Sequence, residues 1–153
     1  MVSIGKLHFR NGEDDNDVWL VHSDDQGRNW TEPVRVNDDP PGAQQFFPWM
    51  DVDDVTGNVH IVFYDRRASF AKHQNLNLRS TWDTEVYVAS SYDGGETWEN
   101  LRVSEEKFRT NPKGFFGDYN NISAYDGIVR PIWTRNDDGV LSIWTAILDG
   151  YLE

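Results

Sequence analysis

Short runs of apolar residues, bounded by polar residues, recur along this chain. Residues 17–22 read Asp-Val-Trp-Leu-Val-His, and residues 85–90 read Glu-Val-Tyr-Val-Ala-Ser. Such short runs, rich in Val and aromatic residues, are typical of strands, and Gly, Asn and Asp separate them at short spacing. No stretch of more than ten residues has a clean period of 3.6, so the pattern predicts an all-β protein.

Two turns that follow these stretches share one pattern. Residues 23–30 and 91–98 both read Ser-x-Asp-x-Gly-x-x-Trp, and each precedes another short predicted strand. A strand, a turn and a strand used twice indicate an internal repeat. The residues that carry the pattern are Ser23, Asp25, Gly27 and Trp30 in the first copy, and Ser91, Asp93, Gly95 and Trp98 in the second.

The residue types of this turn have a physical explanation. The Asp carboxylate can fold back onto the following backbone amides, as in an Asx-turn, and the Gly supplies a positive φ. The Trp can lie over the turn and bury roughly 200 Å² of surface. We therefore expect Trp30→Ala or Trp98→Ala to destabilise the fold by about 3–5 kcal/mol.

The pattern resembles the Asp-box, or BNR repeat, of sialidases and related β-propellers. The resemblance implies blades of four antiparallel strands around a central axis. It also implies that the Asp-box is structural and lies away from the catalytic face. The repeat extends beyond the box, because residues 49–63 align without a gap on residues 119–133 and residues 5–9 echo residues 57–61.

These repeats predict one partial propeller domain over residues 1–153, with about two and a half blades. Strands A to D are counted outward from the axis. The first blade (about 5–37) has strands B to D at 5–10, 17–23 and 33–37. The second blade (about 46–104) has strands A to D at 46–53, 58–65, 85–91 and 100–104. The third blade (about 115–148) has strands A to C at 119–125, 127–135 and 140–147.

A closed ring needs more blades than this, because propellers have about four to eight. Copies of the chain could complete the ring by self-association, or the sequence could be a fragment of a longer protein. We expect self-association, because a lone partial ring would leave strand edges unpaired and apolar blade faces exposed.

Charge and composition narrow the function classes. The net charge of −12 argues against binding to nucleic acid, whose phosphates would be repelled. No apolar run is long enough to cross a membrane, and the absence of Cys leaves the redox compartment open. The resemblance implies a secreted or periplasmic protein, whereas the residues from Met1 show no apolar segment of a signal peptide, so localisation stays undetermined.

Propeller geometry places the B–C and D–A connections on one face, opposite the Asp-boxes. Such propellers usually bind ligands there, and the long connection between residues 68 and 84 belongs to this face. Aromatic residues suit sugar rings, and Arg suits carboxylates. The candidate ligand-binding residues are Phe46, Phe47, Asp65, Arg67, Trp82 and Phe116.

Sialidases hold the sugar carboxylate with three arginines and use a Tyr nucleophile, a nearby Glu and an Asp acid/base. The resemblance implies catalytic roles for Arg66 and Arg135 in the arginine cluster, for Tyr119 or Tyr64 as the phenol, and for Asp118. No Arg-Ile-Pro segment of the kind that supplies the family's first arginine is present. We expect Arg66→Ala and Arg135→Ala to change the melting temperature by only a few degrees.

The same residues have structural interpretations. Arg66 and Arg67 can form a rim pair bound to neighbouring Asp residues, which we prefer, and the pair 118–119 can pack against adjacent blades. The acidic run 13–17 could ligate Ca²⁺, but its spacing does not fit a calcium loop, so we expect a solvated turn and no cofactor. The four His have no metal-ligand spacing.

Three functions are compatible with these residues. We expect a module that binds a carbohydrate or a protein partner, without a complete catalytic site in one chain. The first alternative is an exo-sialidase-type glycoside hydrolase whose site is assembled between subunits. The second is a structural fragment of a longer propeller. An arginine triad around a Tyr–Glu pair would favour the hydrolase, and only part of it is present.

Overall fold

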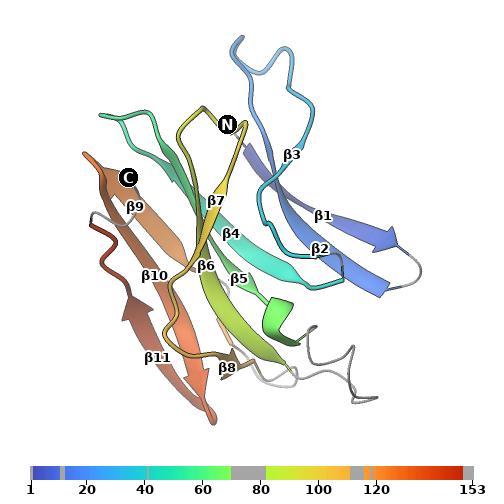
Figure 1. The fold of residues 1–153 in the computed structure, drawn as a ribbon, viewed down its shortest axis with the longest axis vertical. Helices are drawn as coiled ribbons and strands as arrows, with labels where there is room; N and C mark the ends of the chain where they lie inside the picture. Colours follow the sequence, from blue (N-terminus) through green and yellow to red (C-terminus); the bar gives the residue numbers. More distant parts are fainter. Residues whose placement is uncertain are drawn as a thin grey trace.

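The computed structural model describes residues 2–10, 13–40, 42–69, 82–110, 116–117 and 119–149. These residues form three antiparallel sheets and one helical turn over 67–69, so the fold is all-β (Figure 1). The sheets lie side by side in chain order in Figure 1. Within the described segments, no helix has the length and apolar character needed to span a membrane.

The first sheet has the strand order β1-β2-β3. Its strands are β1 (Val2–Arg10), β2 (Glu13–Val21) and β3 (Val34–Arg35). The solvated turn expected at the acidic run 13–17 is wrong, because these residues belong to β2. The backbone register sets residue 6 opposite Asp17 and residue 10 opposite residue 13, so the whole acidic run pairs with β1.

The second sheet follows the order β4-β5-β6-β7. Its strands are β4 (Gln45–Val52), β5 (Val59–Asp65), β6 (Asp83–Ser91) and β7 (Glu99–Arg102). Each lies within two residues of its predicted position. An additional short strand, β8 (Phe108–Arg109), pairs with the start of β6 at Asp83 and Thr84 and was not predicted.

The third sheet has the order β11-β10-β9. Its strands are β9 (Asn121–Tyr125), β10 (Ile128–Asp137) and β11 (Val140–Thr145), again within two residues of the predicted positions. The turns before β10 and β11 each hold an Asp with positive φ followed by a Gly, at Asp126-Gly127 and Asp138-Gly139. Such pairs match the twist of a tight hairpin.

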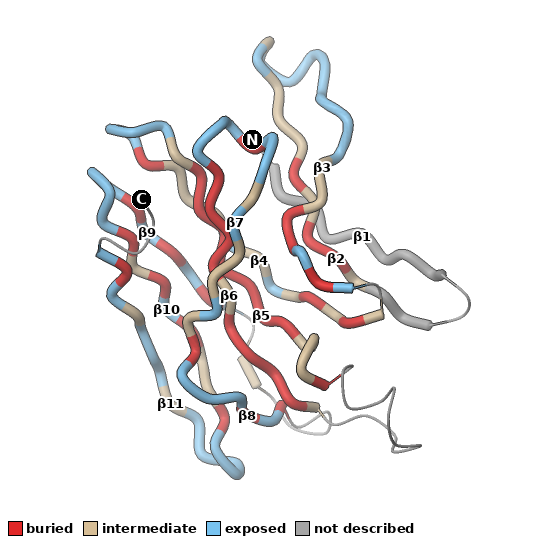
Figure 2. Tube along the Cα trace, viewed as in Figure 1, coloured by how far each residue is buried: buried red, intermediate tan, exposed pale blue. Residues whose placement is uncertain are grey.

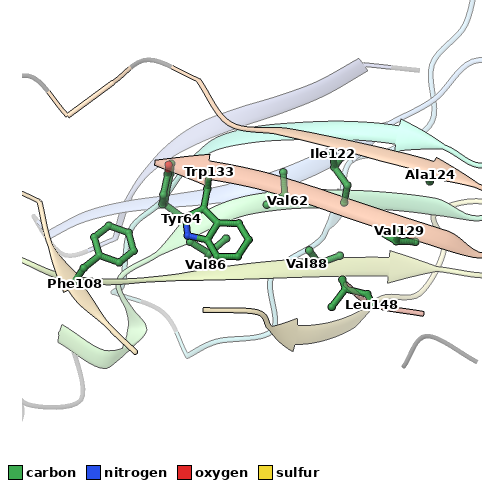
Figure 3. Close-up of a cluster of buried hydrophobic side chains, with 10 residues drawn as sticks. All are labelled: Val62, Tyr64, Val86, Val88, Phe108, Ile122, Ala124, Val129, Trp133 and Leu148. Carbon is green, nitrogen blue, oxygen red and sulfur yellow. The ribbon is translucent and has the colours of Figure 1, made fainter. Parts of the chain in front are cut away.

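Two apolar cores lie between the three sheets. Strand β5 is buried along its whole length, which Figure 2 shows in red. Its side chains alternate, so that Ile61 and Phe63 belong to the core shared with the first sheet. Val62 and Tyr64 belong to the core shared with the third sheet, which Figure 3 shows in close-up. The second sheet is therefore covered on both faces, which explains the continuous apolar run in β5.

Candidate functional site

The residues of the repeated turns and the residues predicted to bind a ligand lie at opposite ends of the sheets. Strand β6 begins at Asp83 and ends at Ser91, where the second repeated turn starts. In Figure 1 the repeated turns, which precede β3 and β7, lie at the upper end, whereas β8 and the turn between β10 and β11 lie at the lower end. We call these the turn end and the cleft end.

At the turn end, the two Asp carboxylates make matching hydrogen bonds. Asp25 Oδ1 accepts the backbone N–H groups of Arg28 at 2.9 Å and Asn29 at 2.8 Å. Asp93 Oδ1 accepts those of Glu96 at 3.0 Å and Thr97 at 2.9 Å. The predicted folding of the carboxylate onto following amides is therefore present in both copies.

These bonds also set the acidity of the two groups. The Asn29 amide is the main cause that lowers the pKa of Asp25 to about 2. The Thr97 hydroxyl and amide lower the pKa of Asp93 well below its ordinary value. Both carboxylates therefore stay ionised at neutral pH, with their oxygens occupied inside the turn.

The two serines complete the match. Ser23 Oγ donates to Asp25 Oδ1 at 2.9 Å and accepts the Gly27 N–H at 2.8 Å. Ser91 Oγ makes the equivalent bonds to Asp93 and Gly95, both at 2.8 Å. The two glycines have positive φ, 83° and 101°, as the pattern predicts.

The two tryptophans differ in burial. Each indole lies over the Gly of its turn, because a Cβ built there would stand 3.7 Å from the ring. Trp98 packs against the core between the first two sheets, whereas Trp30 is 48% exposed. The expectation that the indole is largely buried is therefore wrong for Trp30. The hydrogen bonds of the two repeated turns are therefore structural, because they hold the turns themselves together.

The cleft end contains a hollow between the second and third sheets. It consists of two adjoining spaces of about 300 Å³ and 340 Å³, which share Arg109, Asn136 and Asp138. The first space is also lined by Asp83, Glu106, Lys107, Phe108, Arg135 and Asp137, and the second by Trp82, Thr110 and Gly139. All these residues except Arg135, the last residue of a predicted strand, belong to the connections that the sequence places opposite the Asp-boxes.

Ion pairs organise the wall of this cleft. The buried Asp83 carboxylate receives Lys107 Nζ at 2.9 Å and Arg109 Nε at 3.0 Å. The Arg109 side chain is 74% exposed, so its terminal N–H groups face the open space. Arg135 Nε is 2.8 Å from Asp137 Oδ1, and its guanidinium stacks 4.7 Å from the Trp144 ring centre. Arg109 is therefore the more available cation.

Arg66 is held between aromatic rings beside the cleft. Its guanidinium lies 4.7 Å from the ring centre of Phe46 and 4.6 Å from that of Trp82. It donates to Gln44 Oε1 at 2.5 Å and to Thr110 Oγ1 at 2.9 Å. Burial lowers the pKa of Arg66 to about 10, and no carboxylate of the described residues pairs with it.

Arg67 is bound to neighbouring Asp residues, as the structural interpretation expects of both arginines, whereas for Arg66 that expectation is wrong, because its described partners are Gln44 and Thr110. Its Nη2 is 2.9 Å from the buried Asp65 carboxylate, and its Nη1 is 2.6 Å from Asp38. The guanidinium also lies 4.0 Å from the Tyr87 ring centre. Burial is the main cause that raises the pKa of Asp65, although Arg67 opposes the shift. Arg67 and Asp65 therefore neutralise each other.

The two candidate phenols lie in different environments. Tyr64 donates its hydroxyl to the Thr134 carbonyl and accepts the Thr134 N–H, both at 3.0 Å. Burial raises the pKa of Tyr64 to about 12, which is opposite to what a nucleophilic phenol needs. Tyr119 is 74% exposed, and Asp118 lies outside the described residues.

The candidate aromatic residues largely pack on one another. Phe46 stacks on Tyr64 with ring centres 5.2 Å apart, and Phe116 meets Tyr64 edge-on at the same distance. Phe47 lies where the β4–β5 register is irregular, and its backbone has a φ of 51°. The residue is 38% exposed. Of the aromatic candidates, Trp82 is the one that lines the cleft.

Sequence reasoning missed Asp83, Lys107, Arg109 and Asn136. All four lie in or beside connections already assigned to this face, but nothing in their local pattern separates them from other polar loop residues. Their meeting depends on β8 pairing with β6, which brings residues 83 and 109 opposite each other.

Comparison with known proteins gives no match to a family model and none to a curated protein. Among the described residues, no group of His, Asp and Glu is arranged to hold a metal ion.

Proposed function

We propose that this chain is a sialidase-like Asp-box propeller module that binds a carbohydrate at its cleft end, without a complete catalytic site in one chain. The observation that carries the proposal is the composition of the cleft. It joins the Trp82 indole, the exposed Arg109 guanidinium and the Asn136 amide around a space of about 340 Å³, which is within the range of small-molecule sites.

These residue types suit the surface of a sugar. A pyranose ring presents C–H groups on its faces and hydroxyl groups around its rim. An indole offers an apolar face to the former, while guanidinium, carboxylate and amide groups bind neighbouring hydroxyls in pairs. The remaining polar lining, from Glu106 to Asp138, adds carboxylates of this kind.

The propeller part of the proposal is supported by the way the three sheets follow one another. The strand β4, at one edge of the second sheet, contacts β9, at one edge of the third. Edge strands that meet in this way are expected around a central axis. The matching hydrogen bonds of the two repeated turns support the same interpretation.

The described residues favour binding over hydrolysis. A sialidase-type site needs a phenol of lowered pKa and several arginines free to hold one carboxylate. Tyr64 has a raised pKa and two bonds to Thr134, and Arg67 and Arg135 are bound to carboxylates of this chain.

A glycan array followed by titration tests the proposal. Labelled chain is applied to an array of neutral and acidic oligosaccharides, and the strongest binder is titrated while tryptophan fluorescence is recorded. We expect saturable binding, and we expect Arg109→Ala to weaken it about tenfold or more, the effect of losing one charged hydrogen bond. Lys107 remains to pair with Asp83 in this variant.

Arg28→Ala is the matched control, because Arg28 is an exposed arginine at the turn end. It should bind like the wild type. Absence of saturable binding to every glycan would overturn the binding proposal. Turnover of a fluorogenic sialoside by the purified chain would contradict the statement that one chain lacks a complete catalytic site.

A further inference from the structure

The third sheet has an apolar face that no described residue covers. Val129 and Trp133 of β10 point into the core shared with the second sheet, so neighbouring positions on the strand point away from it. The register adds residues of β9 and β11 to this outer face. Its apolar members, 44% to 67% exposed, are Tyr125, Ile128, Ile132, Leu141 and Ile143.

Corresponding positions in the second sheet are fully covered. Ile132 aligns with Val62 in the repeat that matches residues 49–63 to residues 119–133. Ile143 corresponds to Val86, because Trp144 faces Trp133 as Tyr87 faces Phe63. Val62 and Val86 are 0% exposed under the third sheet, whereas Ile132 is 44% and Ile143 67% exposed. The outer face of the third sheet thus continues an interface that the chain already builds.

The interface between the first and second sheets is built in the same way. Its Val18 and Leu20 are covered by Ile61, Phe63 and Ala89 of the second sheet. In both internal interfaces, one face of a sheet is covered by the opposite face of the sheet that follows it in the chain. If this arrangement is repeated once more, the exposed face of the third sheet would be covered by one face of a fourth sheet that follows it in the row.

We propose that this outer face binds the outer face of the first sheet in a second copy of the chain, head to tail. Val21 belongs to that face, because it alternates with the buried Leu20 and corresponds to Ala89, which is 0% exposed where the first sheet covers it. Figure 1 shows the first and third sheets at opposite sides of the row, so one copy cannot join its own two faces. Repetition of this contact generates a ring or an open chain of copies.

The charge of the protein sets how this contact responds to salt. Each copy carries a net charge of −12, so two copies repel each other at long range. The residues named above are apolar, and the arginines at alternating positions of the two faces, Arg130 and Arg35, are already paired with Asp149 and Asp17 of the same chain. Salt should therefore screen the repulsion without weakening the apolar attraction. We therefore expect self-association to increase with salt, whereas association through ion pairs would decrease.

Sedimentation of the 153-residue chain, without any glycan, tests the inference independently of the binding proposal. The wild type should show masses above one chain that rise with protein concentration and salt. Ile143→Asp should remain a single chain, while the control Val55→Asp, an equally apolar exposed position in the β4–β5 turn, should associate like the wild type. A single-chain mass for the wild type at raised salt and high concentration would overturn the inference.

A mixing experiment separates head-to-tail contact from pairing of two third sheets. Ile143→Asp and Val21→Asp should each remain single chains alone and form a pair when mixed, because each retains one intact face. Self-association of folded Val21→Asp would overturn the head-to-tail arrangement. If Val21→Asp does not fold, the Ile143→Asp variant is mixed with the wild type instead. The variant should then end the growing assemblies and lower their mass. Unchanged masses would count against the inference.

Discussion

The Asp53 carboxylate, in the turn between β4 and β5, accepts the backbone N–H of Gly127, in the turn between β9 and β10, at 2.8 Å. Asp53 is 0% exposed, and its other oxygen accepts the N–H groups of Val55 at 2.8 Å and Thr56 at 3.1 Å. The Gly127 amide is the largest of the hydrogen bonds that lower the pKa of Asp53 far below its ordinary value. One carboxylate therefore joins the second and third sheets.

Asp53→Asn should lower the melting temperature by several degrees. The amide of Asn has one acceptor oxygen, so its NH₂ group would face one set of backbone donors, and buried donors left unpaired are costly. Thermal unfolding followed by circular dichroism measures the effect. Asp54→Asn, an exposed position in the same turn, is the control, and equal melting temperatures for the two variants would contradict the role of Asp53.

Acid should destabilise the protein through the carboxylates of the repeated turns. The folded-state pKa of Asp25 is about 2, below the value of about 3.9 in unfolded chains. Such a group stabilises the fold above pH 4 and loses this contribution as the pH falls toward about 2. In urea unfolding across this range, Asp25→Asn should show a shallower fall in stability than the wild type. Arg28→Ala, at an exposed position of the same turn, is the control, because it removes no carboxylate, and its curve should keep the wild-type slope.

Features that depend on neighbouring residues could be predicted from the sequence. The strands of the second and third sheets lie within two residues of their predicted positions, because short apolar runs and turn residues are local signals. The hydrogen bonds of Asp25 and Asp93 follow from the same local pattern. The first hairpin was misjudged, because its acidic run 13–17 resembles a turn in composition but pairs with β1.

Contacts between residues that lie far apart in the sequence could not be predicted. Tyr64 meets Thr134 across seventy positions of sequence, and no local pattern indicates this bond. The short strand β8 forms where the buried Phe108 joins the core beside Tyr64. The cleft therefore results from packing between two sheets. The sequence alone does not indicate that Lys107, Arg109 and Arg135 lie close together, because only this packing brings them to one place.

Tyr64→Phe should destabilise the fold by about 1–3 kcal/mol, because it leaves the N–H and carbonyl of Thr134 without their partner. Urea unfolding measures this loss. The phenol should also titrate late, since burial raises the pKa of Tyr64 to about 12. Spectrophotometric titration of wild type and variant should show one tyrosine fewer in the variant above pH 11, and a difference already present near pH 9 would indicate an activated phenol instead.

Trp98→Ala and Trp30→Ala should now have unequal effects. Trp98 packs against the core between the first two sheets, so its removal should cost about 3 kcal/mol or more. Trp30 is 48% exposed and covers mainly Gly27, so its removal should cost about 1 kcal/mol. Chemical unfolding of both variants under the same conditions checks this order. Equal losses would mean that the two turns are packed alike.

Arg66→Ala should be more destabilising than the sequence suggests. The change removes a guanidinium that stacks on Phe46 and Trp82 and donates to Gln44 and Thr110. Desolvated cation–π contacts are each worth about 0.5–2 kcal/mol, so we expect a loss of about 2 kcal/mol or more in urea unfolding.

Arg135→Ala is the comparison, because Arg135 stacks on one ring, that of Trp144, and pairs with Asp137 at the surface. Its removal should cost about 1 kcal/mol, less than the removal of Arg66 from between two rings. If Arg66→Ala unfolds at the same urea concentration as Arg135→Ala, the guanidinium of Arg66 does not hold the two rings together. It would then be free to leave them for a ligand, and the aromatic residues around it would count as part of the site. If Arg66→Ala is the less stable protein, Arg66 is a structural residue that keeps the Trp82 indole in place, and Arg109 remains the cation proposed for ligand binding in the cleft.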